Sequence, residues 1–363
     1  MLEKFIQQLA SSRHLTEQEV RLAVGQLVDE GVAPALKAEF LCQLALKGET
    51  VEEIASFAVA LREKAVQPPL DAAWREANEI LDVCGTGGDR LNTFNISTTV
   101  ALVCAATGVA VAKHGNRAIT SQAGSADVLE ALGIRINLPP ADAARSLQER
   151  QFAFFFAPDY HPAFKYITPA RKLCAERGQR TIFNFLGPLL NPARPSAQLV
   201  GVARPELCEP LARVLQSLGV GRGMVVSGRV DRPSAASGST NPADAQSKHA
   251  FLDEFSTLGD NTIAEFYQER GFSSSVMETG QFPLQPAALA DLAGSDRVAN
   301  AEIVRRILRG QERGPKRDAV LLNAAAGLFV GNRAASFSAG WELAAEVIDS
   351  GRAFGKLKEL AEG

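Results

Sequence analysis

Three glycines that follow an apolar segment are the first residues in this chain that could bind an anion. Residues 80–83 lead into Gly85-Thr86-Gly87-Gly88-Asp89. Glycine adopts backbone conformations that other residues avoid, and it leaves peptide N–H groups accessible, so such a loop can hold a phosphate. A glycine cluster is also typical of an ordinary turn, and the interpretation therefore depends on the residues that follow.

A polar helix start follows the glycine loop. Asn95-Ile96-Ser97-Thr98 directly precedes the apolar run 100–103. Such residues cap helices, but they also offer unpaired N–H groups, two hydroxyls and the positive end of the helix dipole to a phosphate. Because only a short loop separates this helix start from the glycine loop, phosphate binding is the favoured interpretation.

A second candidate loop follows the next apolar run. It contains Lys113-His114-Gly115-Asn116-Arg117, and Thr120, Ser121, Gly124 and Ser125 then precede another helical segment. Lysine and arginine can carry the charge of a diphosphate, and Asn116 can orient a planar acceptor through hydrogen bonds. Two such loops on neighbouring units predict a diphosphate site between them.

The adjacent acids Asp253-Glu254 suggest a metal at the same site. Neighbouring acids are most often solvated at a surface. However, Mg²⁺ binds few protein carboxylates and completes its coordination with phosphate oxygens and water. A diphosphate site would need such a pair.

The residues around these motifs predict an α/β fold with a mainly parallel sheet covered by helices. From residue 80 onward, short apolar runs alternate with helical segments. Ligands bind such sheets beyond the carboxyl ends of the strands, where both loops would lie. The expected strands are residues 80–83, 109–112, 152–156, 199–202 and 224–226, and helices are expected near 98–107, 126–132, 140–150 and 205–218.

The segments outside the predicted sheet have patterns of their own. Residues 1–74 predict a smaller all-helical domain, because Thr16 with Glu19 and Thr50 with Glu53 fit capping boxes. Residues 75–363 would form the α/β domain. Within it, residues 229–250 have too few apolar side chains for a core and predict a flexible insertion. Two strand-like stretches follow, and helices are expected from about 285 to the end, one of them interrupted by Asn323.

Composition excludes several classes of function. The 363 residues are 46% hydrophobic and carry a net charge of −3, which argues against a protein that neutralises nucleic-acid phosphates. The apolar runs are too short to span a membrane, and the N-terminus lacks the layout of a signal peptide. We therefore expect a cytoplasmic protein without nucleic-acid or membrane partners. The five cysteines, which lack metal-ligand spacing and are expected to be reduced, are Cys42, Cys84, Cys104, Cys174 and Cys208.

These motifs, taken in order, closely resemble the anthranilate phosphoribosyltransferase family, and the resemblance covers nearly the whole chain. Beyond the two loops, the matching segments are Gly124-Ser125-Ala126-Asp127-Val128-Leu129-Glu130, Ala157-Pro158 with His161-Pro162-Ala163, Thr181-Ile182-Phe183-Asn184 with Leu186-Gly187-Pro188-Leu189, and Arg317-Asp318-Ala319-Val320-Leu321-Leu322-Asn323.

The resemblance implies a pentosyltransferase that moves phosphoribose from phosphoribosyl diphosphate to the amine of anthranilate, in tryptophan synthesis. It implies that Gly85, Asn116 and Arg171 contact anthranilate, and that Ser97, Asp253 and Glu254 hold two Mg²⁺ ions. The donor would be bound by Gly85, Gly88, Asp89, Thr93, Asn95, Ile96, Ser97, Thr98, Lys113, His114, Gly115, Asn116, Arg117, Thr120, Ser121 and Ser125.

The resemblance carries further structural expectations. It implies a nucleoside phosphorylase/phosphoribosyltransferase-like C-terminal domain, a helical return segment at about 162–192 that packs with the N-terminal domain, and a homodimer joined through that domain. The chain departs from the family in three places. Its insertion before the acidic pair could displace Asp253 and Glu254, and a longer segment at 172–179 could shift Arg171. The third departure is Thr120, where the family commonly has serine.

The chemistry expected from this reading is displacement at the anomeric carbon through an oxocarbenium-like state. Lys113 and His114 are candidates for stabilising and positioning the leaving diphosphate. An aromatic amine is uncharged near neutral pH, so no strong general base is expected. The alternatives are a transferase with another acceptor, a nucleoside phosphorylase, or a non-catalytic homologue.

Overall fold

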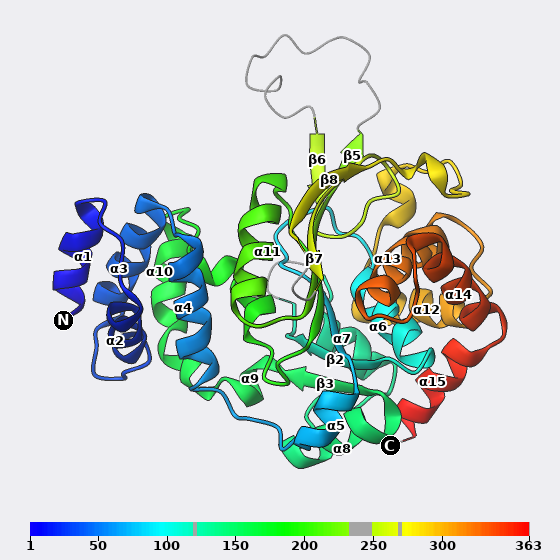
Figure 1. Ribbon diagram of the computed structural model, residues 1–363, viewed down its shortest axis with the longest axis horizontal. Coiled ribbons are helices and arrows are strands. Elements are labelled where there is room, and N and C mark those ends of the chain that lie inside the picture. Colours follow the sequence, from blue (N-terminus) through cyan, green and yellow to red (C-terminus); the bar gives the residue numbers. More distant parts are fainter. Residues whose placement is uncertain (119–121, 232–248, 268–270, 363) are drawn as a thin grey trace, which may run out of the picture.

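The computed structural model describes residues 1–118, 122–231, 249–267 and 271–362. It has a helical bundle on one side and a sheet covered by helices on the other (Figure 1). This confirms the predicted fold class: a small helical domain followed by an α/β domain whose sheet is mostly parallel.

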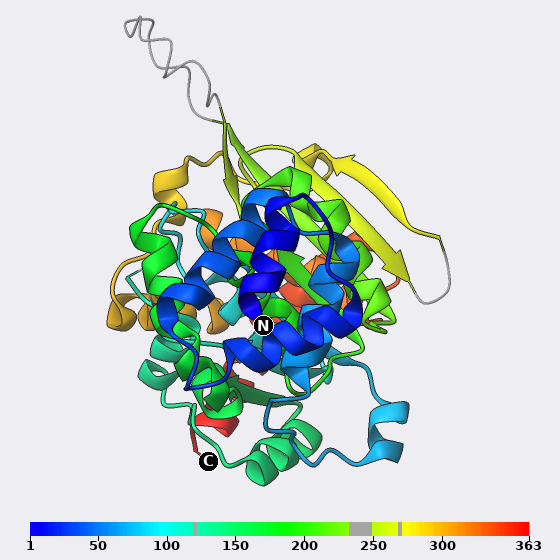
Figure 2. The same cartoon turned by 90° about the vertical axis from the view of Figure 1, so that its left-hand side faces the viewer.

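The helical bundle begins at the N-terminus and is completed by a later segment. Both predicted capping boxes are present, with the Thr16 and Thr50 hydroxyls accepting from the backbone N–H groups of Glu19 and Glu53. Helix α10 packs against α3, and Figure 2 shows the N-terminal helices of the bundle, in blue, in front of the rest of the chain. The helices are α1 (Leu2–Ala10), α2 (Glu17–Leu27), α3 (Pro34–Lys47), α4 (Val51–Arg62) and α10 (Thr168–Glu176).

The sheet has the order β3-β2-β1-β4-β5-β7-β8, and β6 pairs with β5. The first five strands of this order are parallel, whereas β6, β7 and β8 are antiparallel. All five predicted strands are confirmed. Their bounds are β1 (Ile80–Gly85), β2 (Ala110–Gly115), β3 (Phe152–Phe156), β4 (Ala197–Gly201), β5 (Arg222–Asp231), β6 (His249–Leu252), β7 (Asn261–Tyr267) and β8 (Ser273–Met277).

Helices cover both faces of the sheet because successive strand residues point to opposite sides. On one face, Val83 and Leu199 join a core with α6, α13 and α14, while on the other face Val200 and Val225 join a core that includes α11 and the helical bundle. The remaining helices are α5 (Ala72–Ala77), α6 (Ile96–Ala106), α7 (Ser125–Ala131), α8 (Pro140–Arg150), α9 (Ala157–Tyr160), α11 (Cys208–Ser217), α12 (Arg297–Leu308), α13 (Pro315–Val330), α14 (Phe337–Asp349) and α15 (Arg352–Ala361).

Short 3₁₀ helices connect several of these elements. They are Pro162–Tyr166, Ile182–Asn184, Gly187–Leu190, Pro205–Leu207, Thr279–Gln281 and Leu289–Leu292. Within the described part of the chain, no helix is long and apolar enough to cross a membrane.

Two expected boundaries need correction. The first α-helix after residue 285 begins only at Arg297, because the carboxylate of Asp296 accepts from the N–H groups of Val298 and Ala299 and sets the helix start there. The predicted insertion 229–250 is too wide, since residues 229–231 and 249–250 pair in the β5–β6 hairpin. Residues 232–248 lie outside the described chain.

Candidate active site

The carboxyl ends of β1 and β2 meet at Lys113. Its ammonium donates to the carbonyl oxygen of Val83 at 2.8 Å and lies 3.3 Å from the hydroxyl of Ser97 at the start of α6. The side chain is almost completely buried. Lys113 therefore fixes a positive charge where the glycine loop and the polar helix start come together.

The acidic pair lies at the same place, although it is distant in sequence. The N–H of Gly87 donates to Asp253 Oδ2 at 2.6 Å, and the N–H of Ser97 donates to Glu254 Oε1 at 3.2 Å. Burial raises the pKa of both carboxyls, and the nearby Asp89 raises it further; for Glu254 the pKa reaches about 7 despite Lys113. The long segment before the pair thus does not separate it from the two motifs.

Two adjacent glycines make this approach possible. Gly85 and Gly201 are paired across β1 and β4. A Cβ on Gly85 would lie 2.2 Å from Asp253 Oδ2, and a Cβ on Gly201 would lie 1.7 Å from the Asp253 carbonyl oxygen. Any side chain at Gly201 would push the acidic pair away. The sequence predicts a role for Gly85 but not for Gly201, whose place beside Gly85 depends on strand pairing.

A buried amide holds the residue that follows the acids. Asn323 Oδ1 accepts from the N–H of Phe255 at 2.9 Å, and Asn323 Nδ2 donates to the carbonyl oxygen of Phe255 at 2.9 Å. Asn323 is fully buried in α13. In the sequence, this contact was signalled only by a polar residue that interrupts an apolar helix. By fixing the backbone of Phe255, Asn323 helps to position the preceding Asp253 and Glu254.

The two predicted anion loops lie side by side. Asn95 Nδ2 donates to the carbonyl oxygen of Ala123 at 3.1 Å, which joins the start of α6 to the second loop. Within that loop, Ser125 Oγ lies 3.4 Å from the carbonyl oxygen of Asn116. A Cβ on Gly115 would lie 2.3 Å from Ser125 Oγ, so glycine is required there too. Thr120 and Ser121 lie outside the described residues.

The other donor candidates have less direct placements. Thr98 is buried and its hydroxyl has no hydrogen-bond partner among the described residues. Asp89 accepts from the N–H of Leu91, and Thr93 bridges to Ala293. Gly88 has a φ of +86°, while the side chain of Ile96 is buried in the core.

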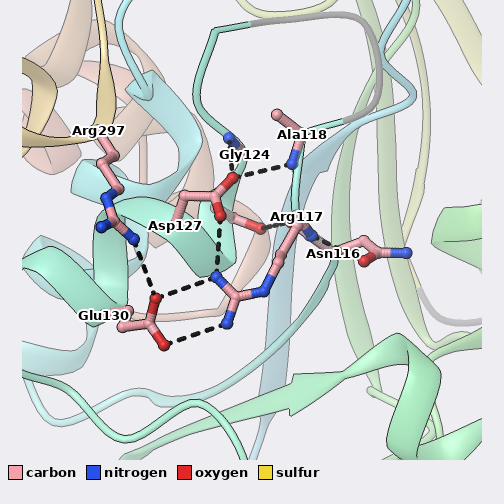
Figure 3. Close-up of polar contacts among 8 residues, drawn as sticks. Asn116, Arg117, Ala118, Gly124, Asp127, Glu130 and Arg297 are labelled. Atoms are coloured by element: carbon pink, nitrogen blue, oxygen red, sulfur yellow. Dashed lines mark hydrogen bonds and ion pairs between the residues drawn. The ribbon is translucent and has the colours of Figure 1, made fainter.

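Arg117 pairs with two carboxylates of α7. Its guanidinium donates to Asp127 and Glu130 (Figure 3). These hydrogen bonds raise the pKa of Arg117. The contact of Arg117 with the donor stays a prediction.

A row of rings leads from the second loop towards α10. His114 lies 5.1 Å from His161, His161 lies 5.2 Å from Phe164, and Phe164 lies 5.7 Å from Phe183 (ring centroids). The guanidinium of Arg171 stands 5.4 Å from the centre of the Phe183 ring. The sequence did not predict this connection, because the rings come from three separate segments: His114 from the first, His161 and Phe164 from the second, and Phe183 from the third.

Burial determines the charge state of these groups. It lowers the pKa of His114 to about 3 and that of His161 to about 4, so both imidazoles are neutral at neutral pH. Burial also lowers the pKa of Arg171, and the described residues provide no carboxylate partner for its guanidinium. An arginine placed in this way suits a ligand carboxylate.

The acidic pair fits a magnesium ion on its chemistry. Burial and the neighbouring Asp89 raise the pKa values of Asp253 and Glu254, because negative charge is unfavourable there. A bound divalent cation would stabilise these charges. Among the residues that the structure describes, no group of three or more His, Cys, Asp or Glu side chains could form a metal site. Two carboxylates and a serine suit Mg²⁺ that takes its other ligands from phosphate and water.

Comparison with known proteins shows the family to which this chain is similar. The family model described as "Glycosyl transferase family, a/b domain" matches residues 77–248 and 245–354, and the one described as "Glycosyl transferase family, helical bundle domain" matches residues 3–65. An anthranilate phosphoribosyltransferase from Lacticaseibacillus paracasei is 43% identical over 360 residues, which cover 99% of this chain and 96% of the relative.

Solved structures show the same similarity. Anthranilate phosphoribosyltransferase from Thermus thermophilus has a TM-score of 0.83 and 38% identity, covering 99% of this chain and 98% of that one. The Saccharomyces cerevisiae enzyme in complex with PRPP and Mg has a TM-score of 0.83 and 25% identity, covering 99% of this chain and 97% of that one.

Proposed function

Because the chain belongs to the family of anthranilate phosphoribosyltransferases, we infer that it transfers the phosphoribosyl group of phosphoribosyl diphosphate to the amine of anthranilate. The products are N-(5-phosphoribosyl)anthranilate and diphosphate, and the step belongs to tryptophan biosynthesis. One structural observation supports the location of the reaction most strongly: Asp253 and Glu254 contact Gly87 and Ser97 beside Lys113.

The donor would lie between the two loops. Lys113 is held by Val83 and Ser97, so its charge faces the departing diphosphate without any rearrangement. Preorganised charge of this kind stabilises a developing anion more than a mobile side chain does. The remaining donor contacts proposed from the sequence are Gly85, Gly88, Asp89, Thr93, Asn95, Ile96, Ser97, Thr98, His114, Gly115, Asn116, Arg117, Thr120, Ser121 and Ser125.

Magnesium is the metal that this site would bind. The yeast relative was crystallised with PRPP and Mg. In this chain, Ser97, Asp253 and Glu254 would hold two ions, and bound magnesium would neutralise the diphosphate oxygens. The number of ions is a proposal, supported by the two separate carboxylates and their raised pKa values.

Anthranilate would approach along the row of rings. Arg171 would bind its carboxylate, and Asn116 and Gly85 would orient its amine towards the donor. His114 and His161 are neutral, so they offer apolar faces and hydrogen bonds rather than charge. The uncharged amine can attack without prior deprotonation, and positioning supplies much of the rate.

We further propose a homodimer joined through the helical bundle and a cytoplasmic location. Leu22 on α2 and Leu46 on α3 are exposed by 43% and 68%, which supports burial of this face against a second copy. All five cysteines are unpaired, as is usual in a reducing compartment. Sedimentation velocity tests the dimer, and Leu46→Glu should favour the monomer.

The activity is tested by following anthranilate fluorescence with phosphoribosyl diphosphate and Mg²⁺. Loss of fluorescence supports the proposed function. Unchanged fluorescence at high protein concentration refutes it, and a parallel assay with inorganic phosphate and nucleosides then tests a phosphorylase. The double variant Asp253→Asn with Glu254→Gln should lose most of the Mg²⁺-dependent rate; a rate and Mg²⁺ dependence like those of the wild type would remove these residues from the metal site.

A further inference from the structure

One carboxylate closes the base of the second loop. Asp127, in the first turn of α7, accepts through Oδ2 from the N–H of Ala118 at 2.9 Å and from the N–H of Gly124 at 2.9 Å (Figure 3). These two residues stand on opposite sides of residues 119–121, which lie outside the described chain. A single oxygen atom of Asp127 therefore holds the two ends of the loop together.

The backbone is closely packed where Gly124 approaches Ala118 and Asn116. A Cβ on Gly124 would lie 2.4 Å from the nitrogen of Ala118 and 2.7 Å from the carbonyl oxygen of Asn116. Asn116 in turn faces Ser125 across the same junction. The positions of both Asn116 and Ser125 thus depend on the contact that Asp127 maintains.

The other oxygen of Asp127 is also occupied. Oδ1 accepts from Arg117 Nη1 at 3.0 Å. Arg117 makes two further hydrogen bonds to Glu130, which also pairs with Arg297 at 3.4 Å. Partial burial raises the pKa of Asp127, but the hydrogen bonds from Ala118, Gly124 and Arg117 outweigh it and lower the pKa overall. Asp127 is therefore charged at neutral pH.

We propose that Asp127 is a positioning residue for phosphoribosyl diphosphate, since it holds Ala118 and Gly124 together and, with them, the neighbouring donor contacts Asn116 and Ser125. The proposal rests on the proposed function. Asp127 acts through Ala118 and Gly124 and does not itself touch the donor. Among the described residues, the carboxylate of Glu130 contacts the side chains of Arg117 and Arg297 and no backbone group, so its loss leaves Ala118 and Gly124 joined.

This difference between Asp127 and Glu130 provides a matched pair of variants on one helix. Asp127→Leu keeps the approximate size of the side chain but removes both oxygens, so that no side-chain acceptor remains for the N–H groups of Ala118 and Gly124. We expect the dissociation constant for phosphoribosyl diphosphate, measured by calorimetry with Mg²⁺ and without anthranilate, to rise about tenfold, equivalent to about 1.4 kcal/mol. Glu130→Gln removes only exposed ion pairs and should change it less than about threefold.

Several outcomes would overturn the proposal. Donor affinity of Asp127→Leu equal to that of the wild type would do so, including when its Tm is lowered, because the residue would then have only a structural role. An equal loss of affinity in Glu130→Gln would do so as well. If Asp127→Leu does not fold, Asp127→Glu displaces the carboxylate by one methylene and must still weaken donor binding. A wild-type protein that binds no donor would instead refute the proposed function.

Discussion

Replacing Asn323 by leucine should damage both the stability of the protein and its use of magnesium. The substitution keeps the size of the side chain and removes its hydrogen bonds. Asn323 makes two hydrogen bonds to the backbone of Phe255 and one to the carbonyl oxygen of Ala319, all at 2.9 Å. Phe255 directly follows Asp253-Glu254 and is itself fully buried.

The size of the effect follows from the groups left without partners. A buried polar group that loses its hydrogen bond costs about 1–3 kcal/mol, so the N–H and C=O of Phe255 together cost about 2–6 kcal/mol. The buried leucine offsets about 1.5–3 kcal/mol through its apolar surface. The net loss of about 2 kcal/mol should lower the Tm by roughly 3 °C in a chain of 363 residues. Freeing the acidic pair should also raise the Mg²⁺ concentration for half-maximal activity by about tenfold or more, as for other residues that orient metal ligands.

The assay is thermal unfolding combined with Mg²⁺ titration of the anthranilate fluorescence rate. Leu328→Ala is a suitable control, because Leu328 is fully buried in the same helix and its truncation costs about 2–5 kcal/mol while the hydrogen bonds between Asn323 and Phe255 are kept. This control should lower the Tm and leave the Mg²⁺ requirement unchanged. If Asn323→Leu behaves in the same way as the control, the reasoning about the acidic pair is wrong.

Three further predictions concern other parts of the site. Gly201→Ala places a Cβ 1.7 Å from the Asp253 carbonyl oxygen and should lower kcat/KM more than about tenfold. The control Gly221→Ala, whose Cβ would have its nearest neighbour at 3.6 Å, should keep the wild-type rate. Equal rates for the two variants would contradict the steric argument. Arg171→Ala should raise the KM for anthranilate about tenfold or more, since a charged hydrogen bond contributes about 1.5–3 kcal/mol, and an unchanged KM would remove it from the acceptor site. Because burial lowers the pKa of His161 to about 4 in the folded protein, the unfolded chain binds the extra proton below about pH 6.5. The contribution of neutral His161 to the free energy of unfolding is therefore fully present above that pH, and it falls by about 1.4 kcal/mol per pH unit towards pH 4. His161→Phe should flatten the dependence of Tm on pH in this window. A dependence as steep as that of the wild type would refute the burial argument.

The sequence was sufficient to predict the elements that have strong local patterns. The apolar runs of the five parallel strands and the two capping boxes come from neighbouring residues, and both are present. The proximity of the two anion loops could also be predicted, because the carboxyl ends of neighbouring parallel strands meet at one edge. The contact of Asn95 with Ala123 agrees with that expectation.

The features that the sequence did not predict depend on contacts between distant segments. Gly201 resembles any strand glycine until β4 pairs with β1 and brings Asp253 against it. Asn323 stood out only as a polar residue in an apolar helix, and nothing local indicated Phe255 as its partner. The ion pairs of Arg117 with Asp127 and Glu130 on α7 were likewise not predicted, and its contact with the donor stays a prediction.

Because of the β5–β6 hairpin, the position of the acidic pair does not depend on the number of residues between the two strands. Asp231 and His249 are opposite each other in the ladder, and β6 then returns directly to Asp253-Glu254. Whatever joins Asp231 to His249, the acids leave the sheet at the same point. Loop-closure entropy changes by only about 0.6 kcal/mol for each doubling of length. An epitope, a reporter protein or a natural insertion could therefore be accommodated between Asp231 and His249 without loss of catalysis, which makes this position suitable for protein engineering.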